Sequence, residues 1–168
     1  MTREMGFLLT GIIALLILLV MLGAWRRRLR RDSGLTAPLG VPEHGEVLAR
    51  LEVLYVSTTR HEEPLERLAV TPLAYRARGE LAITDRGAAL CLDGAPTVFL
   101  ASARIVEVAR ATVTIDRVVE PGGLIRLTWL IADEHPVDSY LRSAHGETAT
   151  IISELERLRA TPTTGASS

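Results

Sequence analysis

The segment Leu124–Ala132, with the sequence LIRLTWLIA, has the clearest structural pattern in the chain. Large apolar side chains occupy alternate positions, and Arg126 and Thr128 lie between them. A period of two is typical of a β-strand that buries one face and exposes the other. We therefore expect a strand here, with a buried face formed by Ile125, Leu127, Trp129 and Ile131.

Similar but shorter patterns flank this segment, and turn signals separate them. Tight turns are expected at Asp85-Arg86-Gly87 and Asp93-Gly94, and a charged turn at Arg60–Pro64. Two further turns are expected at Glu120-Pro121-Gly122-Gly123 and at Asp133–Pro136. The sequence predicts seven strands in all: Glu46–Ser57, Arg76–Thr84, Ala88–Leu92, Thr97–Leu100, Arg104–Ile115, Leu124–Ala132 and Val137–Leu141.

The period becomes helical near the C-terminus. Between His145 and Arg159, apolar residues recur at intervals of three and four, as at Ile151, Leu155 and Leu158. Glutamates and arginines occupy the opposite face, so this helix is amphipathic. An antiparallel sheet of seven short strands has an open end that such a helix can cover. The fold class predicted is therefore mainly β, with a C-terminal amphipathic helix packed on the sheet.

The N-terminal segment Met5–Trp25 contains 21 residues and no charge. As a helix it would be about 31 Å long at ~1.5 Å per residue, enough to cross a hydrocarbon core of ~30 Å. A cleaved signal peptide and an uncleaved transmembrane anchor are the two interpretations of this segment. A signal peptide has a net positive start and a shorter apolar run. Here Glu4 offsets Arg3 and the positive block comes after the apolar run, so the anchor is favoured.

Five arginines follow the apolar segment within six residues. Basic residues flank membrane helices on the cytoplasmic side, which predicts a single-pass protein of the cell (inner) membrane with a cytoplasmic C-terminal domain. Each basic residue near an anionic leaflet contributes about 1 kcal/mol, so a membrane-surface contact is expected; a stop-transfer signal alone is the alternative. The residues concerned are Arg26, Arg27, Arg28, Arg30 and Arg31.

The whole chain is predicted to have four parts. Residues 1–31 form the anchor and its arginine block, and residues 32–44 form a linker marked by glycine and proline. Residues 45–160 form the folded domain, and residues 161–168, TPTTGASS, form a disordered tail. Gly6, Thr10 and Ala14 are spaced so that two anchors can approach closely, and a homodimer through this helix is one hypothesis.

Several functions are excluded by residues that the chain lacks. All 19 basic residues are arginines, and there is no lysine and no asparagine. Schiff-base chemistry, a P-loop lysine and a Cys-His-Asn arrangement are therefore impossible. Two Trp, three Tyr and two Phe are too few for a base-stacking surface, so no nucleic-acid partner is expected. Cys91 is the only cysteine and is interpreted as a small strand residue.

Two clusters offer groups that bind metals in other proteins, His61-Glu62-Glu63 and Asp133-Glu134-His135. Neither has the helical i, i+4 spacing or the cysteine pairing of a metal motif, so both are interpreted as solvated turns. Motifs for a nucleophilic serine, a phosphate loop or paired catalytic carboxylates do not occur in the sequence. We expect no catalytic residue, no metal and no cofactor, and the ligand-binding residues stay unknown.

Several segments resemble actinobacterial membrane proteins that carry a bacterial PH-like (pleckstrin-homology-like) domain. The resemblance covers about residues 46–158 and rests on packing and turn motifs. It implies a PH-like barrel of seven strands, partly open and closed by a C-terminal helix, and it implies no activity. The motifs are Tyr55–Thr59, Pro64–Arg67, Gly79–Thr84, Val118–Leu124 with Thr128-Trp129, and Val137–Tyr140.

One departure from this resemblance concerns lipids. Lipid-binding PH domains place a basic cluster in the first hairpin loop, whereas here the region reads Arg60-His61-Glu62-Glu63-Pro64. The two glutamates would repel a phosphate, so phosphoinositide binding is not implied.

The leading hypothesis is a membrane-anchored, non-enzymatic PH-like module that binds a protein partner or organises a complex. The alternatives are an anionic-lipid-sensing domain and an accessory subunit of a transport or export assembly. The charge distribution favours the protein-binding hypothesis, because residues 1–31 carry a net charge of +5 whereas residues 32–168 carry a net charge of −6. An acidic domain is repelled by an anionic leaflet and is better suited to meeting a protein.

Overall fold

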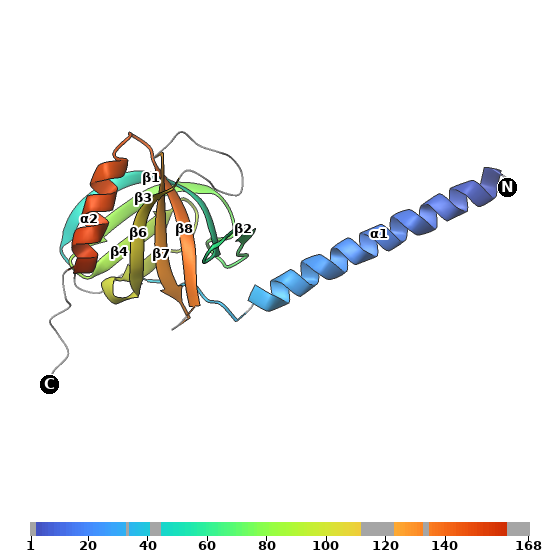
Figure 1. The fold of residues 1–168 in the computed structure, drawn as a ribbon, viewed down its shortest axis with the longest axis horizontal. Coiled ribbons are helices and arrows are strands. Elements are labelled where there is room, and N and C mark those ends of the chain that lie inside the picture. Colours follow the sequence, from blue (N-terminus) through green and yellow to red (C-terminus); the bar gives the residue numbers. More distant parts are fainter. Residues whose placement is uncertain (1–2, 33, 41–44, 112–122, 133–134, 161–168) are drawn as a thin grey trace. The chain divides into compact units, whose positions relative to one another are not determined.

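The computed structural model describes residues 3–32, 34–40, 45–111, 123–132 and 135–160. The chain divides into two units, residues 1–34 and residues 35–168. Helix α1 (Arg3–Asp32) forms the first unit, and a sheet with helix α2 (Thr148–Ala160) forms the second (Figure 1). The sequence predictions for the turns at 120–122 and 133–134 and for the tail at 161–168 lie outside the described residues.

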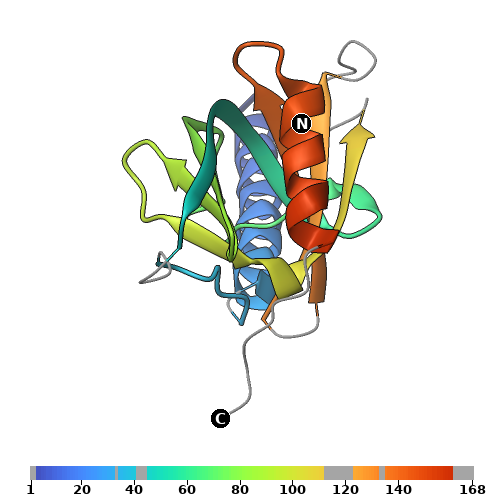
Figure 2. The same cartoon turned by 90° about the vertical axis from the view of Figure 1, so that its left-hand side faces the viewer.

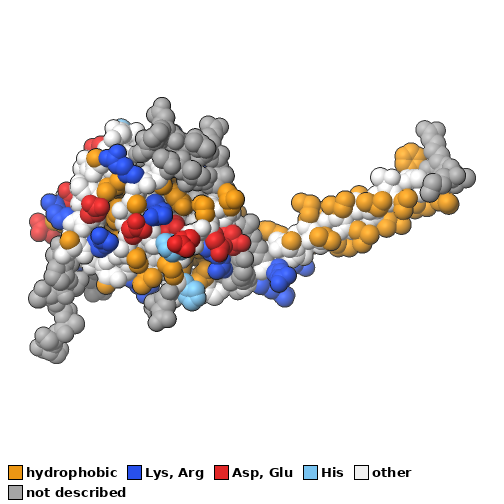
Figure 3. Space-filling view, viewed as in Figure 1, with side chains coloured by type: hydrophobic (Ala, Val, Ile, Leu, Met, Phe, Trp, Pro, Cys, Tyr) orange, Lys and Arg blue, Asp and Glu red, His pale blue; other side chains and the backbone are white. Residues whose placement is uncertain are grey.

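Helix α1 is apolar along most of its length. Its residues Met5–Arg27 are long and apolar enough to cross a membrane, and a signal sequence near an N-terminus meets the same description. Apolar side chains cover most of the helix, and basic side chains gather at its C-terminal end (Figure 3). The helix continues past Trp25 as far as Asp32, so the arginine block lies on the same helix as the apolar segment. The hydroxyl of Thr10 donates to the carbonyl of Gly6, and self-association through this stripe stays a prediction.

The second unit is built around one antiparallel sheet (Figure 1). Its described residues form eight strands in the order β5-β4-β3-β1-β8-β7-β6, and the short β2 pairs with β1 off this path. The strands are β1 (Val47–Arg60), β2 (Glu63–Arg67), β3 (Ala77–Thr84), β4 (Gly87–Leu92), β5 (Val98–Ala101), β6 (Ile105–Ala111), β7 (Leu124–Ile131) and β8 (His135–Ser143).

Strand β1 joins the two halves of the sheet. It pairs with β3 from Val47 to Tyr55 and with β8 from Val53 to Arg60. Only residues 53–55 therefore pair with β3 and β8 at once. The register of β1 against β8 shifts between Tyr55 and Ser57, which marks a β-bulge at Val56. A bulge sharpens strand twist and bends the sheet.

Helix α2 closes the opening that this curvature leaves. Strands β5 and β6 end the sheet order and are not paired with each other. The helix contacts β6 and also reaches β3, and Figure 2 shows it standing over the opening between the two halves. Ile151, Leu155 and Leu158 are buried beneath it, and Arg159 donates to the carbonyl of Val106 on the edge of β6 at 2.8 Å. The predicted fold class, a PH-like sheet closed by a C-terminal helix, is confirmed.

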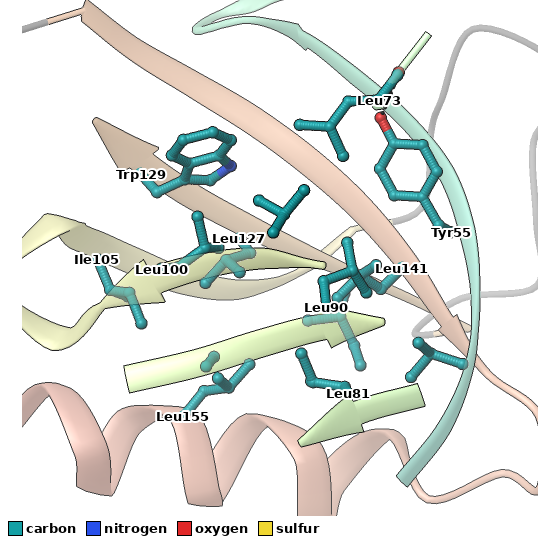
Figure 4. Close-up of a cluster of buried hydrophobic side chains, with 14 of the residues drawn as sticks. Tyr55, Leu73, Leu81, Leu90, Leu100, Ile105, Leu127, Trp129, Leu141 and Leu155 are labelled. Carbon is teal, nitrogen blue, oxygen red and sulfur yellow. Dashed lines mark hydrogen bonds between the residues drawn. The ribbon is translucent and has the colours of Figure 1, made fainter. Parts of the chain in front are cut away.

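The core lies between the sheet and α2. Trp129 is fully buried, as the alternation in β7 predicts, and Leu127 lies beside it (Figure 4). Tyr55 enters the same core from β1 and Leu155 enters it from α2 (Figure 4). All four predicted inward residues of β7 are at most 1% exposed: Ile125, Leu127, Trp129 and Ile131.

Two local expectations from the sequence differ from the structure. The charged turn expected at Arg60–Pro64 contains only residues 61 and 62, because β1 extends to Arg60 and β2 begins at Glu63. This is why the sheet has eight described strands and not seven. Residues 35–40, expected within a linker, lie against β5, where Phe99 donates to the carbonyl of Pro38 at 2.9 Å. Ala37 is buried in the core beside them.

A first prediction concerns the close packing of β3 on β4. A Cβ added at Gly79 would clash with the backbone carbonyl of Cys91, which cannot move without breaking the strand pair. We expect Gly79→Ala to lower the free energy of unfolding by about 1–3 kcal/mol or more, as measured by urea denaturation in detergent. Gly34→Ala, which adds its Cβ in open space, is the matched control. Equal stability of the two variants would contradict the observed packing.

Candidate functional site

The arginine block lies on the last turns of α1. Arg26, Arg27 and Arg30 are exposed, whereas the side chains of Arg28 and Arg31 lie outside the described residues. Successive helix positions are rotated by about 100°, so Arg26 and Arg30 share a face and Arg27 lies beside it. Contact with a membrane surface, which the sequence predicts for all five arginines, stays a prediction.

A buried carboxylate connects the turn after β1 with β8 and β7. Asp138 is 2% exposed, and its Oδ1 accepts from the hydroxyl of Thr128 at 2.6 Å and lies 3.0 Å from Nδ1 of His61. Its Oδ2 accepts from the backbone N–H of Glu62 at 3.3 Å. Glu62 has a positive φ of 63°. The cluster therefore holds a strained turn on the sheet, and the expected solvated turn at His61-Glu62-Glu63 is anchored at His61.

A second polar network lies inside the core. The hydroxyl of Tyr55 donates to the carbonyl of Leu73 at 2.8 Å and lies 2.8 Å from Thr58 Oγ1. Thr58 Oγ1 lies 2.7 Å from Ser139 Oγ, which also accepts from Trp129 Nε1 at 2.9 Å. Residues three apart in a regular strand face opposite sides, so only the bulge at position 56 lets Tyr55 and Thr58 meet. The network joins β1, β8 and β7 and satisfies groups whose burial would otherwise be costly.

The burial of two tyrosines changes their acidity. Desolvation raises the pKa of Tyr55 far above its usual value, because a buried phenolate would lose its hydration. Burial also raises the pKa of Tyr140, and the carboxylate of Asp138 raises it further. Both hydroxyls stay protonated at neutral pH, which suits structural donors.

An open groove with a volume of about 970 Å³ lies on the outer face of the sheet. It crosses β8, β1, β3 and β4, and Leu54 of β1 lies in its lining. Leu54 pairs with Arg78 of β3 on one side and with Arg142 of β8 on the other. The next cross-strand row brings together Glu52, Glu80 and Cys91.

The charges in this groove differ in how they are paired. Arg50 pairs with Glu80 at 2.6 Å, and His145 pairs with Glu52 at 3.1 Å. For Arg78 and Arg142 the described residues provide no side-chain partner, although both are exposed and line the groove. Sequence reasoning missed both arginines because they lie far apart in the chain and become neighbours only through strand register.

The metal-ligating side chains are dispersed. No group of three His, Cys, Asp or Glu suited to a metal occurs within the described part of the chain, and Asp133 and Glu134 lie outside it. Cys91 is a free, half-buried thiol that lines the groove, and the hydroxyl of Thr97 lies 3.7 Å from its sulfur.

The sheet order, the curled β1 and the covering helix are those of a PH-like domain. The chain belongs to the bacterial PH domain-like family, whose model matches residues 36–156. PH-like domains are generally non-catalytic. No curated protein matches the chain.

Solved structures also resemble this chain. A chain of "The 8S snRNP Assembly Intermediate" is similar over 79% of this chain and 97% of its own, with a TM-score of 0.50 and 11% identity. The C-terminal domain of an unknown protein from Leishmania infantum is similar over 81% of this chain and 98% of its own, with a TM-score of 0.44 and 11% identity. The first likeness supports the fold alone.

The role of the buried carboxylate can be tested by Asp138→Asn. The variant keeps the shape but loses the charge that strengthens three hydrogen bonds, so we expect a loss of about 1–3 kcal/mol in the free energy of unfolding at pH 7. Asp93→Asn changes an exposed carboxylate in a turn and should stay within about 0.5 kcal/mol of the wild type. Urea denaturation followed by Trp129 fluorescence, in a Trp25→Phe background, measures both. A neutral Asp138→Asn would show that the cluster adds nothing to stability.

The raised pKa of Tyr55 predicts a loss of stability at alkaline pH. Above the ordinary pKa of 10.0, the unfolded chain releases the phenolic proton while the folded chain retains it, so unfolding becomes more favourable as pH rises. Tyr55→Phe should cost about 1–2 kcal/mol at pH 7 through lost hydrogen bonds and should flatten the decline between pH 10 and 11. Tyr75→Phe, at an exposed position, should change neither quantity. An unchanged alkaline slope in Tyr55→Phe would refute the assignment.

Proposed function

We propose that this chain is a membrane-anchored, non-enzymatic PH-like module that binds a protein partner at the cytoplasmic face of the cell membrane. The observation that carries the proposal is the groove over β8, β1, β3 and β4. It has a volume of about 970 Å³, and the charged side chains of Arg78 and Arg142 in its lining have no side-chain partner among the described residues. Such a surface suits recognition more than chemistry, since reactive groups need positioned partners.

The anchor and its orientation follow from α1. A membrane helix with Arg26, Arg27 and Arg30 at its C-terminal end is expected to keep that end in the cytoplasm. The domain follows these arginines and therefore lies on the same side.

The absence of catalysis rests on how the buried polar groups are used. Among the described residues, Asp138 and His61 form the one carboxylate–histidine pair in which one side chain is buried. The carboxylate of Asp138 also accepts hydrogen bonds from Thr128 and from the backbone N–H of Glu62. Tyr55 and Ser139 are engaged inside the core. These groups are engaged in hydrogen bonds that stabilise the fold.

A second candidate function, sensing of anionic lipid, is favoured by the exposed Arg26, Arg27 and Arg30. It requires the domain itself to approach the leaflet. The −6 charge of residues 32–168 opposes that approach, so we place lipid contact at the helix end and protein contact at the groove.

The proposed function is tested by photo-crosslinking in cells of the native host. A photoreactive residue replaces Ala144, an exposed residue of the groove, in the full chain. We expect a discrete protein adduct from this position and none from the matched position Val106, which is 45% exposed on the edge of β6. Lipid adducts alone would favour the second candidate, and no adduct from position 144 would overturn the proposal.

The orientation is measured on the same cells with a membrane-impermeant maleimide in a Cys91→Ser background. Ala160→Cys, at the exposed end of α2, should be labelled only after permeabilisation. Thr2→Cys should be labelled in intact cells. Labelling of Ala160→Cys in intact cells would place the domain outside and refute the cytoplasmic assignment.

A further inference from the structure

We propose that the groove binds an extended acidic segment of the partner, with two carboxylates on Arg78 and Arg142 and the intervening part of the segment passing over Leu54. This inference rests on the proposed function and specifies the chemistry of the partner. The three residues form one cross-strand row, Arg142 on β8, Leu54 on β1 and Arg78 on β3. The row is thus cation, apolar surface, cation.

The spacing of the row sets the spacing of the ligand. Neighbouring strands lie about 4.8 Å apart, so the backbones that carry Arg142 and Arg78 are about 9.6 Å apart. A peptide in the polyproline II conformation repeats its side-chain direction every third residue, over about 9.3 Å. Carboxylates at positions i and i+3 of such a segment therefore match the two guanidinium groups, and the backbone between them passes over Leu54.

The groove lies on the face of the sheet and not at an edge. Strand addition needs unpaired backbone groups, and residues 53–55 are already paired on both sides. Recognition must therefore use side chains. A polyproline II segment suits this condition, because it forms no internal hydrogen bonds and needs no strand partner.

The pairing of the charges leaves the guanidinium groups of Arg78 and Arg142 available to an anionic group such as a carboxylate. Arg50 neutralises Glu80, and Oε2 of Glu52 lies 3.1 Å from Nε2 of His145, so among the described residues neither glutamate forms an ion pair with the two free guanidinium groups. Guanidinium groups bind carboxylates through paired, charge-assisted hydrogen bonds, and partial desolvation in a groove strengthens them.

Asp93 limits this attraction. It lies next to the β3–β4 pair formed by Gly79 and Leu92, and its backbone N–H donates to the carbonyl of Arg78. Its carboxylate forms no ion pair with Arg78 among the described contacts. An added acid on the ligand must therefore overcome repulsion from Asp93, which makes the removal of this charge a sensitive test.

A bilayer is a poorer fit than a peptide. The groove is concave, whereas an anionic leaflet presents a broad surface, and the net charge of residues 32–168 is −6. Two arginines cannot offset that repulsion over a wide contact, but they can bind two carboxylates locally.

The test uses the full chain in nanodiscs of phosphatidylcholine, which carry no net charge. The probe is the fluorescent peptide Ser-Pro-Glu-Leu-Pro-Glu-Pro-Ser, with its carboxylates three residues apart, and its glutamine counterpart is the control peptide. Fluorescence anisotropy measures binding. Alkylation of Cys91, the only thiol in the chain, reports whether the peptide covers the groove.

We expect the acidic peptide to bind and to slow Cys91 alkylation, and the glutamine peptide to bind about tenfold more weakly. Arg78→Gln and Arg142→Gln should each weaken binding about fivefold or more, and Asp93→Asn should strengthen it about twofold. Arg110→Gln makes the same charge change on exposed β6, outside the groove, and should leave binding unchanged. Circular dichroism confirms that each variant is folded.

Three outcomes would overturn the inference. The acidic peptide fails to bind, or it binds the double variant Arg78→Gln/Arg142→Gln as tightly as the wild type. Alternatively, the same double variant loses affinity for vesicles containing phosphatidylglycerol while no peptide binds, which would make the groove a lipid site.

The crosslinking experiment separates this inference from the function on which it rests. If the protein adduct at position 144 persists in the double variant, the function stands and the acidic ligand is wrong. If the wild type forms no adduct, the function itself fails.

Discussion

The rest of the domain depends on the double pairing of β1. Only residues 53–55 are hydrogen-bonded to β3 and to β8 at once, and before and after them β1 serves one half of the sheet. Strand alternation then sends Val53 and Tyr55 into the core and leaves Leu54 on the outer face. The core and the groove therefore lie on opposite faces of the sheet at the same three residues. A change of register by one residue would exchange them.

The buried polar groups reinforce this arrangement from both faces. Inside, Ser139 of β8 connects Thr58 of β1 with Trp129 of β7. Outside, Asp138, the residue before Ser139, connects β7 with the turn that follows β1. Adjacent residues of one strand thus join the same elements on opposite faces. Burial of these groups without partners would cost more than the hydrogen bonds contribute, so the networks favour a single register over its alternatives.

Much of the fold could be predicted because it is encoded locally. Alternation in residues 124–132 predicts β7 and its buried Trp129, and the helical spacing of Ile151, Leu155 and Leu158 predicts α2. The short β2 could not be predicted, because Asp138 supports the turn before it from more than 70 residues away. The contact of Pro38 with β5 could not be predicted either, because it joins residues far apart in the sequence and the composition of its segment is that of a linker.

The candidate site was less predictable than the fold. The arginine block is a run in the sequence, whereas Arg78 and Arg142 are single residues in two strands. The one usable signal is that each is an outward arginine in a strand pattern, and many surface arginines share it. Register alone makes them neighbours of Leu54. A binding site on the face of a sheet is assembled from distant segments, so the order of the strands must be known before the site can be recognised.

The contact of residues 38–40 with β5 also has a mechanical consequence. Phe99 and Thr97 bond to Pro38 and Gly40, and Leu39 bridges Val98, so a pull on the chain at residue 35 reaches the sheet first at its β5 edge. Because β1 comes later in the chain, tension on the N-terminal helix would break these contacts before it reached β1, the strand on which both the core and the groove are built.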